Sequence, residues 1–356
     1  LPGPSSKPIG GYKIIYEYAN RFVSDGYSVN IVFPVLTLWG TYGFKYKVVL
    51  LLRFLISKVY NSFRPNKWFD LDKKVKLYIT LNLNDIFLPK SDIYIATAIE
   101  TVEPVLNIKS VTNSHKFYFI QGFENWGQYS TESVYESYSS PINKIVISKH
   151  LQKLVKKAGG NAYLVHNGFD FKQFYQKTSI INKDKFNITM LYHNSELKGC
   201  VDGVDALKIV KRRYPELTAS FFGKDAQPEA LPDWITYYKN PKKDELNAIY
   251  NNSAIYIGTS YSEGFGLVIG EAMMCGSAVA CTNNEGYAEL AINEETALLS
   301  PIKDPQNLAK NIMRLIQDDD LRIRLAKNAN ANIQNFTWGL AFENMKDILF
   351  INPNKC

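Results

Sequence analysis

The order of the apolar segments constrains the fold of this chain most, because strand-like and helix-like patterns alternate through it in two successive series. Residues 12–24 carry apolar side chains on one helical face, and residues 29–33 follow as a short apolar run typical of a buried strand. Strands that alternate with helices predict parallel sheets, so we expect an α/β protein with one doubly wound sheet in each half. Further strand-like runs lie at residues 75–79, 93–98, 117–120, 145–147, 163–165, 188–192, 219–222, 235–238, 254–257 and 278–281.

The domain boundary is predicted in the polar, lysine-rich stretch that follows a turn at residues 167–170. We expect a first domain over residues 1–175, a second over residues 176–338, and a terminal helix within residues 339–356 that packs back toward the first domain. A chain of 356 residues is long enough for two such domains. Because ligands of open α/β sheets bind beyond the carboxyl ends of the strands, the two domains are expected to face a common cleft.

The strongest local signal is a glycine-rich turn between a strand and a helix, within residues 260–273. Gly264 and Gly266 allow a tight turn and bring peptide amides close to a ligand. A helix that opens here directs its free N–H groups and the positive end of its dipole outward, which favours a bound phosphate. Two carboxylates flank this position, Glu263 before the turn and Glu271 in the helix.

Glu263 and Glu271 have the spacing of the E-x7-E signature of family 4 of the retaining glycosyltransferases, which this chain resembles. The usual form E-G-F-G-L-x-x-x-E-A-M-x-C-G is matched almost letter for letter by residues 263–276. The resemblance covers most of the chain, including Gly10-Gly11 and the V-x-N-G-x-D pattern that ends at Asp170. It implies a GT-B fold, in which two Rossmann-like domains face a cleft.

The resemblance also implies a role for each matching residue. Glu271 would accept hydrogen bonds from the ribose of a nucleotide-sugar donor, and Glu263 from hydroxyls of its sugar. Lys198 would pair with the diphosphate, and Gly11 would let the N-terminal loop approach it. Two further groups are expected at the donor: the peptide amides of Phe265, Gly266 and Leu267 at the sugar and distal phosphate, and, near the nucleobase, Phe222, Gly223 and residues 239–241.

Fixed cations and amides of this kind stabilise a nucleoside diphosphate as it departs, because they face the negative charge that develops there. The resemblance therefore implies transfer without a metal or a cofactor, from a co-substrate of the UDP, GDP or dTDP-sugar type. It also implies retention of anomeric configuration. The acceptor would attack from the face that the diphosphate leaves, and a diphosphate oxygen would take the acceptor proton.

The chain departs from the family pattern at three places. His193 stands near the usual arginine, where it is either a weaker, pH-dependent cation at the diphosphate or a structural residue at a strand end. Gln121 or Glu124 would occupy the catalytic space in which many relatives carry a histidine near the donor sugar. This Q-x-x-E pattern resembles a subgroup that acts on bacterial surface polysaccharides, including rhamnosyl transferases. Glu285 replaces a glycine that is frequent in the family near the donor sugar, which leaves the identity of that sugar open.

A basic and aromatic segment at residues 39–69 contains no acidic residue. Its apolar run is interrupted by Arg53 and is far shorter than the ~20 residues that span a bilayer. One interpretation is an amphipathic helix that lies on an anionic membrane surface. The other is a helix that packs on the first sheet with solvated lysines. Its basic residues are Lys45, Lys47, Arg53, Lys58, Arg64 and Lys67.

Composition excludes several other classes. The four cysteines form no C-x-x-C pair, so we expect neither zinc nor a disulfide framework, and a reducing compartment fits best. The net charge of +7 comes without an RNP-like strand or a zinc finger, so nucleic acid is not an expected partner. No signal-peptide pattern is visible, and the opening turn at residues 1–4 leaves open whether a first strand precedes it.

These observations predict a cytoplasmic glycosyltransferase, peripheral on the inner face of the cell membrane, that builds a bacterial surface glycan on a glycan or lipid-linked acceptor. The alternative keeps the fold without catalysis, as a scaffold or carbohydrate-binding partner of another transferase. A nucleotide-sugar epimerase of the same fold is a third class. It needs an acid and base pair around the sugar, and the sequence offers no clear one.

Overall fold

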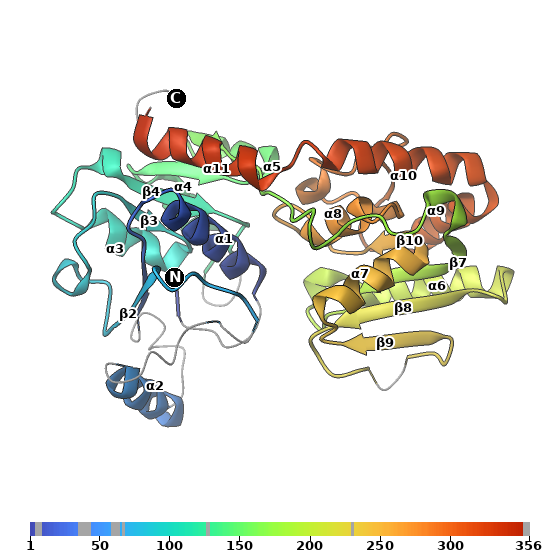
Figure 1. The fold of residues 1–356 in the computed structure, drawn as a ribbon, viewed down its shortest axis with the longest axis horizontal. Helices are drawn as coiled ribbons and strands as arrows, with labels where there is room; N and C mark the ends of the chain where they lie inside the picture. Colours follow the sequence, from blue (N-terminus) through green and yellow to red (C-terminus); the bar gives the residue numbers. More distant parts are fainter. Residues whose placement is uncertain are drawn as a thin grey trace. The chain divides into compact units, whose positions relative to one another are not determined.

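A computed structural model describes residues 1–3, 9–34, 44–57, 65, 68–125, 129–228 and 231–351. The chain divides into two compact units: Leu1–Val165 with Phe342–Cys356, and His166–Ala341 (Figure 1). The second unit begins about ten residues before the predicted boundary. The reason is that the Phe169 N–H donates to the Phe336 carbonyl at 2.9 Å, which ties the connecting segment to the C-terminal half.

The second unit contains one six-stranded parallel sheet in the order β12-β11-β10-β7-β8-β9. Every residue of β10 and β11 is buried, which explains why both strands appear as continuous apolar runs in the sequence. The strand order reverses between the neighbours β7 and β10, so a topological switch point lies at their carboxyl ends. The strands are β7 (Asp184–Leu191), β8 (Thr218–Gly223), β9 (Ile235–Lys239), β10 (Ser253–Gly258), β11 (Ala278–Thr282) and β12 (Ala297–Ser300).

Helices cover both faces of this sheet (Figure 1). Asp304 and Asp318 cap the two helices near the C-terminus through side-chain bonds to backbone N–H groups, and Pro305 occupies a first-turn position that needs no donor. Neither α7 nor β12 was predicted from the sequence. The helices are α6 (Cys200–Arg213), α7 (Lys243–Asn252), α8 (Leu267–Met274), α9 (Pro305–Gln317) and α10 (Asp319–Ile333).

The described residues of the first unit form two parallel sheets, a pair β1-β2 and a four-stranded sheet β3-β4-β5-β6. In the described part of this unit β1 and β3 belong to separate sheets, and residues of β1, β3 and α1 line a cavity of about 370 Å³. The strands are β1 (Asn30–Pro34), β2 (Lys76–Thr80), β3 (Tyr94–Ala96), β4 (Lys116–Ile120), β5 (Asn143–Val146) and β6 (Ala162–Leu164). The helices are α1 (Gly10–Ser24), α2 (Phe44–Ser57), α3 (Val102–Leu106), α4 (Thr131–Ser139) and α5 (Lys149–Lys157).

The chain ends in α11 (Trp338–Lys346) and a π-helical turn over Asp347–Ile351. Within the first unit, Phe342 packs edge-on against Phe22 of α1, and the Lys346 ammonium lies 3.4 Å from an oxygen of Asp25. The later part of α11 therefore belongs to the N-terminal unit.

The basic segment predicted at residues 39–69 contains α2, and the rest of it lies largely outside the described residues. Phe54 is buried, while a row of apolar side chains on α2 is exposed. No described helix combines the length and the apolar character needed to cross a membrane. The exposed apolar residues of α2 are Phe44, Val48, Val49, Leu52, Leu55 and Ile56.

Candidate functional site

Two helices begin side by side at the switch point of the second sheet. β7 leads through a short loop into α6, and β10 leads through the glycine-rich turn into α8. The residues that precede these helices are Gly199 with φ 56° and Gly266 with φ 89°, and neither helix start has a side-chain cap. The first-turn N–H groups of both helices are therefore available to an anion at the edge where α/β sheets bind ligands.

Glycine is required at both positions by geometry as well as by φ. A Cβ on Gly199 would collide with the backbone oxygen of Thr259, and a Cβ on Gly266 would lie 2.7 Å from the Tyr287 ring. The two loops can approach each other and their supporting residues only without these side chains.

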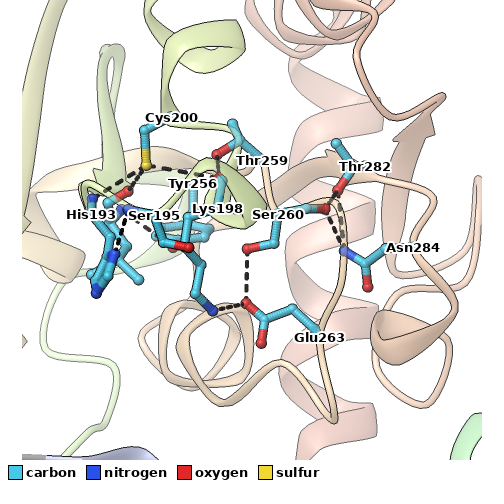
Figure 2. Close-up of polar contacts among 11 residues, drawn as sticks. His193, Ser195, Lys198, Cys200, Tyr256, Thr259, Ser260, Glu263, Thr282 and Asn284 are labelled. Atoms are coloured by element: carbon cyan, nitrogen blue, oxygen red, sulfur yellow. Dashed lines mark hydrogen bonds and ion pairs between the residues drawn. The ribbon is translucent and has the colours of Figure 1, made fainter. Parts of the chain in front are cut away.

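Two hydrogen bonds to backbone carbonyls hold the two loops together. The Tyr261 N–H donates to the Leu197 carbonyl at 2.8 Å, and the Thr259 hydroxyl donates to the Lys198 carbonyl at 2.7 Å. Figure 2 shows the loop of Lys198 and the loop of Glu263 side by side. Residues that are about 60 positions apart in sequence thus form one rigid platform.

Two predicted site residues meet on this platform. The Lys198 ammonium lies 2.5 Å from Oε1 of Glu263, and both side chains are partly exposed, at 28% and 19%. The Ser260 hydroxyl donates to the same oxygen at 2.8 Å (Figure 2). Lys198 and Glu263 are therefore positioned together, and their polar ends remain accessible.

Ser260 is a functional residue to which sequence analysis gave no role. Its carbonyl accepts hydrogen bonds from the Thr282 hydroxyl at 2.5 Å and from Nδ2 of Asn284 at 2.8 Å, so its backbone is fixed by two buried donors. A Ser-x-x-Glu spacing from Ser260 to Glu263 is visible in the sequence. That spacing commonly marks a helix start, and here it fixes a carboxylate before the helix begins.

Glu271 lies in α8, the helix that begins after the glycine-rich turn. Its Oε2 accepts a hydrogen bond from the Tyr250 hydroxyl at 3.1 Å. Burial raises the pKa of Tyr250 well above its usual value, and the nearby Glu271 carboxylate raises it further, so the hydroxyl remains a donor. Glu271 is thus held from beneath by a buried side chain while it remains partly exposed itself.

His193 lies at the end of β7, and its Nδ1 accepts the Ser195 N–H at 2.9 Å. Burial lowers the pKa of His193, and the positive charges of Lys224 and Lys198 lower it further. The lowered pKa favours the neutral imidazole, in which Nδ1 accepts the Ser195 N–H and Nε2 carries the proton. Of the two predicted roles of His193, a cation at the diphosphate is therefore the less favoured.

Other predicted residues contribute backbone more than side chain. Phe265 is buried in an aromatic cluster with His166, Phe169 and Phe336, so only its backbone faces the turn. Phe222 is also buried and packs on Tyr250. Leu267 is the first residue of α8. A Cβ on Gly223 would collide with the Tyr192 carbonyl, so the glycine allows the ends of β7 and β8 to lie close together.

In the first unit, three predicted residues lie near one another in the chain fold. Nε2 of Gln121 donates to the Gly11 carbonyl at 3.3 Å, and a Cβ on Gly11 would touch the Gln121 amide. Glu124 accepts the Ile99 N–H at 2.6 Å. Burial raises the pKa of Glu124 to about 7, because the Ile99 bond opposes the shift only in part and the charge of Glu100 adds to it.

Metal ligation was not expected, and two D-x-D sequences nevertheless occur, at residues 70–72 and 318–320. Oδ1 of Asp72 accepts the Lys74 N–H, whereas Asp318 caps α10 and Asp319 pairs with Lys185. Asp72, Asp318 and Asp319 thus each make local structural contacts. The described residues contain no group of three or more histidine, cysteine or acidic side chains arranged to hold a metal.

Part of the chain is similar in sequence to known glycosyltransferases. Residues 171–332 match the family model described as Glycosyl transferases group 1. An N-acetylgalactosaminyltransferase of Campylobacter jejuni, which acts on N,N'-diacetylbacillosaminyl-diphospho-undecaprenol, is 28% identical over 166 residues, 47% of this chain and 36% of that protein. The O-antigen chain mannosyltransferase B of Escherichia coli is 25% identical over 150 residues, 40% of this chain and 39% of that protein. Each alignment thus spans less than two-fifths of the relative.

A solved structure extends the likeness to the whole fold. The Anabaena protein Alr3699/HepE in complex with UDP-glucose superposes with a TM-score of 0.71 at 18% identity, covering 97% of both chains. At 18% identity, this likeness shows a shared fold and nothing more. The chain therefore has the GT-B fold of two parallel-sheet α/β units, and its residues 171–332 are similar to the model of the group 1 glycosyl transferases.

Proposed function

We propose that this protein is a retaining, metal-independent glycosyltransferase of family 4. It transfers a sugar from a UDP, GDP or dTDP-sugar to a lipid-linked or polymer-linked glycan in bacterial surface polysaccharide synthesis. One observation carries the proposal: two glycine-capped helix starts and the Lys198 ammonium converge at the switch point of the second sheet. Such an arrangement suits a diphosphate that gains negative charge as it leaves.

Each predicted residue has a physical role in this reaction. Lys198 and the amides that open α6 and α8 stabilise the departing diphosphate, which replaces the charge a metal would supply. Glu271, held by Tyr250, accepts from the ribose, and Glu263, held by Ser260, accepts from the sugar. His193 donates a neutral N–H, and residues 222–223 and 239–241 border the base. Gly11, Gln121 and Glu124 act from the first unit on the sugar.

Transfer with retention needs no dedicated protein base, because every bond and proton in the reaction is accounted for by the donor and the acceptor. The bond from the acceptor oxygen to the anomeric carbon forms on the face from which the diphosphate leaves. The bond from that carbon to the diphosphate oxygen breaks, and the same diphosphate takes the acceptor proton. The site therefore needs to hold the leaving group steadily, which the two linked loops favour.

A hydrolysis screen over UDP, GDP and dTDP-sugars tests the proposal. Slow release of free sugar, with proton NMR showing the anomeric configuration of the donor in the first product, supports retaining transfer. Binding without release supports a scaffold, and an isomerised donor supports an epimerase. If no nucleotide sugar binds or reacts, the proposed activity is wrong.

The acceptor is proposed to be presented at an anionic membrane surface, with the enzyme peripheral on its cytoplasmic face. The argument rests on α2, whose exposed apolar row lies within a segment of six basic and no acidic residues. Apolar contact with acyl chains and attraction to anionic headgroups would act together there. Flotation with anionic and neutral vesicles tests it: Leu52→Ser and Leu55→Ser together should lower recovery on anionic vesicles, and equal recovery with both vesicle types contradicts the idea.

A further inference from the structure

The proposed reaction assigns the Lys198 ammonium to the diphosphate, but in the structure this ammonium is paired with Glu263. The ammonium lies 2.5 Å from Oε1 of Glu263, so the two groups form a charge-assisted hydrogen bond. A carboxylate at that point repels an incoming diphosphate and competes with it for the same cation. The ion pair therefore lowers the affinity of the platform for any anion.

Ser260 holds Glu263 independently of Lys198. Its hydroxyl donates to Oε1 at 2.8 Å, while its backbone is fixed by Thr282 and Asn284. When Lys198 moves to a phosphate oxygen, Glu263 loses one of these two donors and keeps the other. Ser260 thus acts as a positioning residue, which keeps the carboxylate aimed while its cation is exchanged.

We propose that Glu263 is an internal competitor for Lys198, and that this competition makes the site discriminate against diphosphates that lack a sugar. The inference rests on the proposed function. A nucleotide sugar compensates the loss of Lys198 from Glu263, because its hydroxyls donate to the carboxylate. Free nucleoside diphosphate or pyrophosphate takes Lys198 and gives Glu263 nothing in return. The spent product is therefore held more weakly than the donor, which promotes its release.

Calorimetric titration with inorganic pyrophosphate tests the competition directly, without a nucleobase or sugar. Glu263→Gln keeps the shape and removes the charge, and it should bind pyrophosphate about three- to tenfold more tightly than wild type at low salt. The gain should shrink in 1 M salt, where the Debye length is about 3 Å. Equal or weaker binding to the variant overturns the proposal.

Two matched variants distinguish the effect of breaking the Lys198–Glu263 pair from the effect of removing a negative charge elsewhere. Glu294 precedes β12, at the amino end of that strand, and forms an exposed ion pair with Arg314. Glu294→Gln breaks this pair and should leave the affinity for pyrophosphate within about twofold. Glu271→Gln removes a charge near the same helix start without releasing Lys198, and should gain less than Glu263→Gln. Equal gains in all three variants overturn the specific role of the pair.

Ser260→Ala should leave pyrophosphate affinity within about twofold while it lowers sugar transfer or donor hydrolysis about tenfold, and Ser260→Thr should restore most of that rate. Loss of both properties together, without rescue by threonine, contradicts the positioning role. The proposed function and this inference fail differently. If nucleotide sugars react normally but Glu263→Gln does not tighten pyrophosphate binding, only the competition is wrong; if nothing reacts, the glycosyltransferase assignment itself fails.

Discussion

The buried hydroxyl of Tyr250 donates to Oε2 of Glu271 at 3.1 Å, so a side chain from α7 fixes the orientation of a carboxylate on α8. This contact supports Glu271 as the acceptor for a ribose. Glu271→Ala should weaken binding of nucleoside diphosphates about ten- to hundredfold, because one hydrogen bond to a charged group contributes about 1.5–3 kcal/mol. Calorimetry measures this, with Tyr250→Phe as a control that keeps the carboxylate and loses only a few-fold. Equal affinities for wild type and Glu271→Ala would remove the residue from the site.

Lys198→Ala should reduce turnover more than donor binding, because the ammonium matters most when charge accumulates on the leaving diphosphate. A loss of about 10²–10³ in kcat is expected, comparable to removal of one preorganised donor from a transition state. Steady-state donor hydrolysis gives kcat and KM separately. Lys208→Ala, which breaks an exposed pair on α6, is the matched control and should change neither value noticeably. A rise in KM alone would mean that Lys198 binds donor and transition state equally.

Gly266→Ala should both destabilise the second unit and abolish nucleotide binding. The positive φ costs about 1–2 kcal/mol for a residue with a Cβ, and here the Cβ also lies 2.7 Å from the Tyr287 ring. Gly159→Ala separates the two effects, since Gly159 has a φ of 83° with no atom within 4 Å of a Cβ. Urea unfolding should show a larger loss for Gly266→Ala than for Gly159→Ala. Equal losses would exclude a steric contribution.

Glu124 should make the protein less stable as the pH rises toward neutrality. Burial raises its pKa from 4.5 to about 7, so the folded state holds one more proton than the unfolded state between these values. The free energy of unfolding therefore falls across this window, by about 2–3 kcal/mol from this group once the pH exceeds 7. Glu124→Gln should flatten the pH profile of urea unfolding between pH 5 and 8. An unchanged profile would show that Glu124 ionises normally.

Much of the fold followed from the sequence because buried parallel strands leave a simple pattern. β10 and β11 are apolar throughout, and their predicted ranges agree with the structure. The helix α4 was missed because its serine-rich sequence has weak helix propensity, and burial of Val134 and Tyr138 stabilises it instead. The separation of the N-terminal strands into two sheets has no local signature, since strand pairing depends on distant segments.

The candidate site was predictable as a set of residues but not as a network. The family resemblance implied that Lys198 and Glu263 act on one ligand, yet nothing in a sequence reports that residues 65 positions apart form an ion pair. The lowered pKa of His193 depends on burial and on neighbouring charges, and its Nδ1 accepts the Ser195 N–H, all of which only a structure provides. Sequence patterns identify groups by type, whereas hydrogen-bond direction and protonation depend on the surroundings of each group.

The backbone bond from Tyr261 to Leu197 and the bond from the Thr259 hydroxyl to the Lys198 carbonyl bear on attempts to evolve a different donor preference. Random libraries that vary one of these loops alone will mostly disturb the other, since contacting positions contribute non-additively. Productive variants are expected from libraries that diversify both loops jointly and screen them as one unit. Deep mutational scanning of the two loops should accordingly show strong pairwise epistasis between them.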